Sequence, residues 1–395
     1  MKLYLKQTFH NMAEFEKHFE EIQSYLNFKD YTLLTKRIID LTLDTENISF
    51  YQKTNLLLDK IDRETELSNL HNDFSELLKE LKTFLQTKPI VAPKTLITAS
   101  AVKKNYGHSA FALGAIDLKV NQGEILGLVG ENGNGKTTLL RLLCGELYVT
   151  SGKIEFHIPH QDLYDLRAKL IYIPQRTATW YGSMFENLQF TATSYGYQPE
   201  ENELIVNLVI SRLGLRKFKN HLWKNLSSGY KMRFELARML LRKPDVLLID
   251  EPLANLDILA QQTILEDFRS IAKSPFRPIG IVLSSQQLYE VEKTSDQVIF
   301  LKNGVQKNLR NEPSSEETIP ETQLVIELES SLSQMQLSEA LGEKLINLQF
   351  NGGTFIATFS GETSVFDFLQ MISEKRIPLQ YFRDITHSTR RFFVS

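Results

Sequence analysis

Residues 125–137 read ILGLVGENGNGKT, a short apolar run followed by a loop with three glycines, a lysine and a threonine. The run has the length of a buried strand, and the apolar residues after the loop favour a helix. From Gly130 to Thr137 the loop satisfies G-x-x-x-x-G-K-[ST] in the strand–loop–helix context that this pattern requires. Its glycines let backbone N–H groups point inward, and the next helix directs its positive end to the same place. The stretch therefore predicts a loop that binds phosphate groups.

The residue types in this loop suit a nucleoside triphosphate with Mg²⁺. Lys136 would bridge the β- and γ-phosphates, and the Thr137 hydroxyl would be a ligand of Mg²⁺. A glycine-rich turn could match the pattern by chance, but the strand before it and the helix expected from Thr138 to Leu147 argue against that. The other nucleotide-binding positions predicted in the loop are Gly130, Asn132, Gly133, Asn134, Gly135 and Thr138.

A second apolar run, VLLI at 246–249, ends in Asp250 and Glu251. In open α/β sheets, ligands bind beyond the carboxyl ends of the strands. We therefore expect Asp250 to hold Mg²⁺ through water and Glu251 to polarise the attacking water. An acidic turn at a strand end is common by itself. Together with the phosphate-binding loop, it indicates hydrolysis of a nucleotide.

Further apolar runs at 170–173 and 279–283 alternate with helical stretches. Runs that are apolar on both faces and separated by helices indicate a largely parallel, buried sheet.

With these motifs, the region from about 96 to 310 resembles the nucleotide-binding domain of ABC transporters, and most of all that of ABC-2 exporter subunits. Tyr106, 24 residues before Gly130, matches the aromatic residue that stacks on adenine in that family. Gln175 matches the glutamine that touches Mg²⁺ and water near the contact with the membrane subunit. Alone, Tyr106 would be a packing aromatic and Gln175 a solvated loop residue, but their order and spacing favour the functional interpretation.

Two more segments carry the resemblance. Residues 226–233, LSSGYKMR, resemble the signature sequence, and residues 253–257, LANLD, match the loop after the catalytic glutamate. Ser227 could simply cap a helix, and Asp257 could cap the helix that begins near Ile258. In the family, the signature serine and glycine, Ser227 and Gly229 here, meet the γ-phosphate bound by the opposite subunit. The resemblance therefore implies a dimer with a second copy or a paralogue.

The sequence departs from the family at two places. The signature reads Leu-Ser-Ser-Gly-Tyr instead of Leu-Ser-Gly-Gly-Gln, and Gln286 stands where the family has the switch histidine. A glutamine amide can donate a hydrogen bond to the γ-phosphate, but it cannot carry a positive charge. Because losing one transition-state contact often costs about 10²-fold in rate, we expect slow hydrolysis.

Residues 1–90 contain no glycine and are typical of amphipathic helices, around 12–26, 29–43 and 48–62. A further apolar stripe, spaced by three and four residues, lies along one helix face and consists of Leu67, Leu70, Phe74, Leu77, Leu81 and Phe84. We predict a helical domain over 1–90, although the stripe could instead pair with a partner helix. A linker at 86–94 with two prolines follows it.

An acidic, serine-rich linker at 311–320 precedes the last region, 321–395. Strands at 323–329 and 378–384, helices at 333–342 and 364–375, and a hairpin at 345–359 around Asn351-Gly-Gly give the order β-α-β-β-α-β. That order matches a ferredoxin-like split unit. The predicted fold is thus an α/β P-loop NTPase domain of the ABC type at 96–310, after a helical domain and before a small α+β domain.

The 395 residues carry a net charge of −3 and a single cysteine, Cys144. Nucleic acid is therefore not an expected partner, and the lack of an internal disulfide fits a reducing compartment. We find no signal peptide and no apolar run of about 18 residues, so another polypeptide would form any path through a membrane.

The resemblance implies a subunit that binds and hydrolyses ATP with Mg²⁺, on the cytoplasmic face of a membrane, and drives a separate integral membrane permease. Two alternatives remain open. A soluble mechanical ATPase acting on ribosomes or DNA is disfavoured by the acidic balance and by the single nucleotide domain. A regulator that dimerises on ATP and hydrolyses it slowly is favoured by Gln286 and opposed by Glu251.

Overall fold

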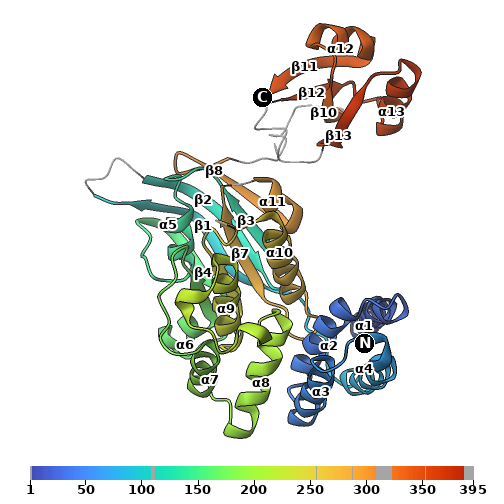
Figure 1. The fold of residues 1–395 in the computed structure, drawn as a ribbon. Coiled ribbons are helices and arrows are strands. Elements are labelled where there is room, and N and C mark those ends of the chain that lie inside the picture. The colour runs from blue at the N-terminus through green and yellow to red at the C-terminus, as the bar shows by residue number, and fades with distance from the viewer. Residues whose placement is uncertain are drawn as a thin grey trace.

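The computed structural model describes residues 2–107, 112–254, 256–286, 288–307, 323–351 and 353–386. Its centre is a six-stranded sheet in the order β5-β6-β7-β3-β8-β9 (Figure 1). The strands are β3 (Ile125–Val129), β5 (Leu170–Ile173), β6 (Val246–Ile249), β7 (Gly280–Ser285), β8 (Gln297–Lys302) and β9 (Val305–Lys307). All neighbours pair in parallel except β8 and β9. The predicted parallel sheet is confirmed, and β3, β6 and β7 are buried along their whole length.

A second, antiparallel sheet goes beyond what the apolar runs predict. It has the order β2-β1-β4 and consists of β1 (Thr95–Asn105), β2 (Ala112–Asn121) and β4 (Ser151–Phe156). Its inner face packs with the helix that follows the phosphate-binding loop and with Leu126 and Leu128 of β3 in one hydrophobic core. The long helices of the central region share a second core with Ile125 and Val129, which point to the other face of the same strand.

The central helices are α5 (Lys136–Leu143), α6 (Leu163–Lys169), α7 (Met184–Ser194), α8 (Pro199–Arg212), α9 (Ser228–Leu240), α10 (Ile258–Ala272) and α11 (Leu288–Thr294). Short 3₁₀ turns, η2 (Arg216–Phe218) and η3 (Trp223–Asn225), connect α8 to α9. The expected helix from Thr138 to Leu147 is wrong at both ends. It begins at Lys136 and ends at Leu143, because Gly145 has a left-handed backbone with φ of 74° that turns the chain out of the helix.

The N-terminal residues form four helices, α1 (Lys2–Asn27), α2 (Tyr31–Thr45), α3 (Ile48–Ile61) and α4 (His71–Leu85). The expectation of one helix along the whole stripe from Leu67 is wrong, since Leu67–Leu70 form a 3₁₀ turn, η1, before α4. The Asn69 side chain donates to Glu64 at 3.2 Å and its backbone N–H donates to Glu66, contacts that hold a turn and not an α-helix. Leu70, Phe74, Leu77 and Leu81 of the stripe are nevertheless buried in one core.

These helices pack directly on the central region, where α2 and α3 lie against α8 (Figure 1). Ile39, Tyr51 and Leu58 belong to the core that α8, α9 and α10 share, and Phe276 of the central region enters the core of the N-terminal helices. Asn55 also donates to the Leu204 carbonyl at 3.2 Å. We call α1–α4 the helical unit.

The C-terminal elements are β10 (Val325–Ser330), α12 (Gln334–Leu341), β11 (Leu345–Asn351), β12 (Thr354–Phe359), α13 (Val365–Glu374) and β13 (Leu379–Asp384), with a 3₁₀ turn η4 (Gly342–Lys344) after α12. The sheet is antiparallel, in the order β11-β12-β10-β13. The predicted linker at 311–320, Gly352 of the hairpin turn and the chain after residue 386 lie outside the described residues. Within the described ranges, no helix is long and apolar enough to cross a membrane.

Leu81→Ala tests the core of the helical unit. Leu81 is fully buried, so we expect the substitution to lower the free energy of unfolding by about 2–5 kcal/mol. Leu56→Ala is the matched control, because Leu56 is 64% exposed on α3 and its loss leaves no cavity. Urea denaturation of both variants measures the difference. Equal effects of the two substitutions would contradict this packing.

Candidate functional site

The phosphate-binding loop connects β3 to α5 and needs its glycines for two different reasons. Gly133 and Gly135 have left-handed φ values of 82° and 95°, which favour glycine. At Gly130 a Cβ atom would lie 2.4 Å from the carbonyl oxygen of Leu301, so only glycine fits between β3 and β8. Asn134, predicted to bind nucleotide, is buried, and its side-chain oxygen accepts from the Asn303 N–H at 2.9 Å. That contact fastens the loop to the turn after β8. Asn132 is exposed.

Lys136 begins α5 and is buried. Its ammonium group donates to the carbonyl oxygens of Gly130 at 2.6 Å and Glu131 at 3.2 Å. It also lies 3.0 Å from Oε1 of Glu251, so the two side chains form an ion pair, although they are not oriented for a hydrogen bond. The predicted phosphate-binding lysine and the predicted catalytic carboxylate therefore face one another.

Asp250 lies at the carboxyl end of β6, where three hydroxyl groups converge on its buried carboxylate. Thr137 donates to Oδ2 at 2.7 Å, Tyr172 to the same oxygen at 3.2 Å, and Ser284 to Oδ1 at 2.6 Å. Burial, with the Asp250 charge as a second cause, raises the pKa of Tyr172 well above its ordinary value, so this hydroxyl stays a donor. Sequence patterns pointed to Thr137 and Asp250 but not to Tyr172 or Ser284.

Glu251 has a left-handed backbone with φ of 50°, unusual for a residue with a side chain. Its N–H donates to the Ser284 hydroxyl at 3.0 Å. Ser284 thus holds both acidic residues: it accepts from the backbone of Glu251 and donates to the side chain of Asp250. The serine pair before Gln286 is the signal that could have identified Ser284, because a buried strand of aliphatic residues seldom ends in hydroxyls without a polar partner.

The remaining predicted residues on this side lie at the rim. Tyr106 is 41% exposed, its hydroxyl is 3.3 Å from that of Thr138, and the Lys104 ammonium is 5.5 Å from the centre of its ring. Gln175 and Gln286 are exposed and follow the carboxyl ends of β5 and β7, the same edge at which Asp250 lies. The structure thus places both glutamines near the acidic pair in the fold, without a direct contact among the described residues.

The signature residues lie on a separate helix. Ser227 is the N-cap of α9, and its hydroxyl accepts from the Tyr230 N–H at 3.5 Å. Asp257 is the N-cap of α10 and accepts from Ala260 at 2.9 Å. A Cβ atom at Gly229 would lie 3.5 Å from Leu256, so the two helix starts are neighbours. In the described part of the chain, no contact joins Ser227, Gly229 or Asp257 to Lys136. The prediction that Ser227 and Asp257 could cap helices is confirmed. Asn255, in the loop between Glu251 and Asp257, lies outside the described residues.

This arrangement suits a magnesium–nucleotide complex. Mg²⁺ prefers hard oxygen ligands and takes only one or two from the protein when phosphates supply others. The Thr137 hydroxyl and the Asp250 carboxylate are 2.7 Å apart and meet that requirement. The buried ammonium of Lys136 and the loop N–H groups supply positive charge for phosphate oxygens, and Glu251 supplies a carboxylate beside them.

Comparisons with known proteins agree with this geometry. A family model described as "ABC transporter" matches residues 113–254. The ABC transporter ATP-binding protein NatA of Bacillus subtilis is 29% identical over 48% of this chain and 77% of its own length. The zinc import ATP-binding protein ZnuC of Rickettsia bellii is 31% identical over 54% of this chain and 85% of its own length. The solved structure of CbiO1 from Clostridium perfringens, part of the ABC transporter complex CbiONQ, is 25% identical, with a TM-score of 0.50 over 54% of this chain and 87% of that one.

Lys136→Ala tests the loop. We expect ATP affinity to fall by about 10-fold or more, because the variant loses a buried charged donor, and phosphate release to fall with it. Nucleotide titration by calorimetry and a phosphate-release assay measure both. Lys153→Ala is the control, since Lys153 is 69% exposed and, among the described residues, pairs with Glu155 alone. Unchanged ATP affinity and turnover in Lys136→Ala would contradict the assignment of the loop.

Proposed function

This chain belongs to the ATP-binding proteins of ABC transporters, which are ATPases, and we propose that its own residues hold and hydrolyse Mg-ATP at the edge formed by β3, β6 and β7. The observation that carries this proposal is the convergence of Lys136, Thr137, Asp250 and Glu251, which come from two distant parts of the sequence. Tyr106 would stack on the adenine and the loop N–H groups would surround the phosphates.

Each residue then has a defined task. Lys136 is already desolvated and would exchange its contacts with backbone carbonyls and Glu251 for the β- and γ-phosphates. Thr137, Asp250 and Gln175 would hold Mg²⁺, which neutralises the charge that develops on the phosphates. Glu251 would orient the attacking water, and its strained backbone, fixed through Ser284, would aim the carboxylate at the γ-phosphate. Gln286 would donate one neutral hydrogen bond to that phosphate.

We propose a dimer because the second set of groups for the phosphate lies away from the first. Ser227 and Gly229 begin α9, a helix of 13 residues whose N-terminus suits an anion. The Ser227 hydroxyl accepts one weak bond from its own helix and can still donate to another group. Two copies, or this chain and a paralogue, would bring each signature to the ATP bound by the other.

We propose further that the chain drives a separate integral membrane permease from the cytoplasmic face. The similarity to CbiO1, which is part of the ABC transporter complex CbiONQ, supports this proposal. The proposed domains are a helical domain at 1–90, the ABC ATP-binding domain at 96–310 and a small α+β domain at 321–395. The antiparallel order β11-β12-β10-β13, with a helix after β10 and after β12, supports a ferredoxin-like unit in the last domain.

Glu251→Gln tests the composite site. The variant keeps the phosphate and Mg²⁺ ligands but loses the carboxylate that orients water. We expect sedimentation velocity with Mg-ATP to show a stable dimer, and the same variant with Mg-ADP to stay monomeric, because ADP lacks the phosphate that both copies share. A variant that remains monomeric at saturating ATP would refute the composite arrangement.

Gln286→His tests the switch position. A histidine can add charge assistance to the contact with the γ-phosphate, roughly doubling its strength. We expect the rate of hydrolysis to rise, with little change in ATP affinity, because charge on the transferring group changes during the reaction. Gln286→Ala should lower the rate further. ATPase assays on the dimer with its membrane partner measure the rates, and equal rates for all three proteins would remove Gln286 from the site.

A further inference from the structure

A cavity of about 300 Å³ lies where the helical unit meets the central region, on the side opposite to the ATP site. Asp44 and Tyr51 of the helical unit form one wall. Asp245 and Ile279, which immediately precede β6 and β7, form another, so the cavity lies at the amino ends of the strands whose carboxyl ends form the ATP site. Its volume is at the lower end of the range for small-molecule sites.

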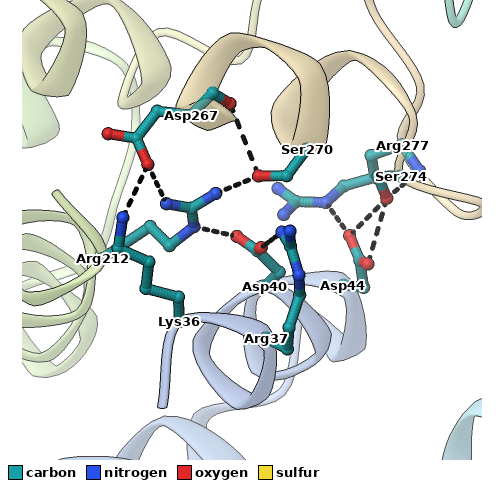
Figure 2. A network of polar contacts seen from close by, with 9 residues as sticks. All are labelled: Lys36, Arg37, Asp40, Asp44, Arg212, Asp267, Ser270, Ser274 and Arg277. Atoms are coloured by element: carbon teal, nitrogen blue, oxygen red, sulfur yellow. Dashed lines mark hydrogen bonds and ion pairs between the residues drawn. The ribbon is translucent and has the colours of Figure 1, made fainter. Parts of the chain in front are cut away.

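Charged residues form part of the cavity wall, and most of them are already paired (Figure 2). The buried Arg212 guanidinium donates to Asp40 at 2.6 Å and to Asp267 at 2.7 Å. Asp44 accepts from Arg277 at 2.8 Å and from Ser274 at 3.0 Å. Arg212 and Arg277 belong to the central region and Asp40 and Asp44 to the helical unit, so this network joins the two parts.

Several polar groups of the lining have no partner among the described residues, and these are what a ligand could satisfy. The side chain of Gln122 is buried, its amide donates to the Pro278 carbonyl at 3.0 Å, and its oxygen accepts nothing. Asp245 is half-buried and forms no ion pair among the described residues. Burial raises the pKa of its carboxyl group, and the charges of Lys169 and Lys94 partly offset that rise.

The lining also holds hydroxyl and guanidinium donors. Within the described ranges, the hydroxyl groups of Tyr51 and Tyr197 make no hydrogen bond, although Tyr51 is only 4% exposed. The Arg277 side chain is 39% exposed and uses its Nε atom for Asp44, and its Nη atoms pair with no other side chain among the described residues. The cavity therefore combines the unpaired Gln122 oxygen and the Asp245 carboxylate with two tyrosine hydroxyls and the Arg277 guanidinium.

We propose that this cavity binds a free α-amino acid with an aliphatic side chain. Asp245 and the Gln122 oxygen would accept from the ammonium group, and Tyr51, Tyr197 and Arg277 would donate to the carboxylate. The side chain would pack on the aliphatic part of the lining, which consists of Leu43, Ile205, Val209, Leu240, Ile271 and Ile279.

The charge balance favours a zwitterion over a simple ion. Asp40 and Asp44 are neutralised by Arg212 and Arg277, and Glu46 lies 3.6 Å from Lys88. The lining itself holds four acidic and three basic side chains, and Lys88 beside Glu46 makes up the difference. With this partner counted, the wall has no net charge to attract an anion or a cation alone. An anion would leave the buried Gln122 oxygen unpaired, at the cost of an unmet hydrogen bond. An amine without a carboxylate would leave the hydroxyl and guanidinium donors of the wall unused.

Because the ligand would contact both the helical unit and the central region, its binding favours their association. The fold thus places an amino-acid site and an ATP site at opposite ends of β6 and β7.

Calorimetry with L-leucine on the full chain, without nucleotide, tests the proposal. We expect one leucine per chain and a rise in the melting temperature. L-Leucinamide lacks the carboxylate and 4-methylpentanoate lacks the ammonium group, so each should bind about 10-fold or more weakly. If leucine does not bind, or if either analogue binds as tightly as leucine, the proposal is overturned.

Conservative variants locate the site. Tyr51→Phe and Asp245→Asn change one polar group on each side of the cavity, and each should weaken leucine binding about 10-fold. Tyr25→Phe is the matched control, because the Tyr25 hydroxyl donates to Glu21 at 2.7 Å outside the cavity. Lys136→Ala should leave leucine binding intact, which separates this result from the fate of the ATP site. Should leucine bind equally to the wild type, Tyr51→Phe and Asp245→Asn, the cavity is not the site.

Discussion

The structure of the candidate ATP site depends on the buried carboxylate of Asp250. A buried charge is tolerated only when hydrogen bonds satisfy it, and here hydroxyls from three different elements do so: Thr137 of α5, Tyr172 of β5 and Ser284 of β7. These contacts fix the carboxyl ends of neighbouring strands relative to one another and to the phosphate-binding loop. The same serine fixes the backbone of Glu251. Residues separated by more than a hundred positions thereby form one rigid group.

Four strands of the central sheet, β3, β5, β6 and β7, could be predicted because they are apolar on both faces and the loop between β3 and α5 has a specific pattern. The edge strands β8 and β9 carry exposed residues and give no such signal. The antiparallel sheet was harder to infer, since the apolar residues of β2 alternate with exposed ones such as Asp117 and Lys119, and that alternation is short and broken by register shifts. The packing of the helical unit on the central region has no periodic signal at all. Asp40 and Arg212 are 172 positions apart and read as solvated charges until the fold brings them together.

The signature and the loop after Glu251 show why capping and function are compatible. Ser227 and Asp257 cap α9 and α10, as the simpler interpretation holds, yet a helix start with free N–H groups is also what binds an anion. A further contact links these parts: Trp180, in the loop that follows Gln175, donates to the buried Glu235 of α9 at 2.8 Å. The loop with Gln175 and the helix with Ser227 are therefore held together by a side chain that no motif includes.

The contact between the helical unit and the central region is partly ionic, and this determines how much it contributes to stability and how far it fixes the orientation of the two parts. Replacing a buried ion pair by apolar residues is often neutral, whereas removing one partner is costly because the other charge stays buried. Arg212 is 2% exposed and shared between Asp40 of α2 and Asp267 of α10. Loss of the helical unit would remove Asp40, one of the two carboxylates that pair with Arg212. It would also expose Arg212 and Asp267 to water. The network therefore favours one orientation of α2 against α8 and α10, and Ile39, Tyr51 and Leu58 add apolar contacts in the core of the central region.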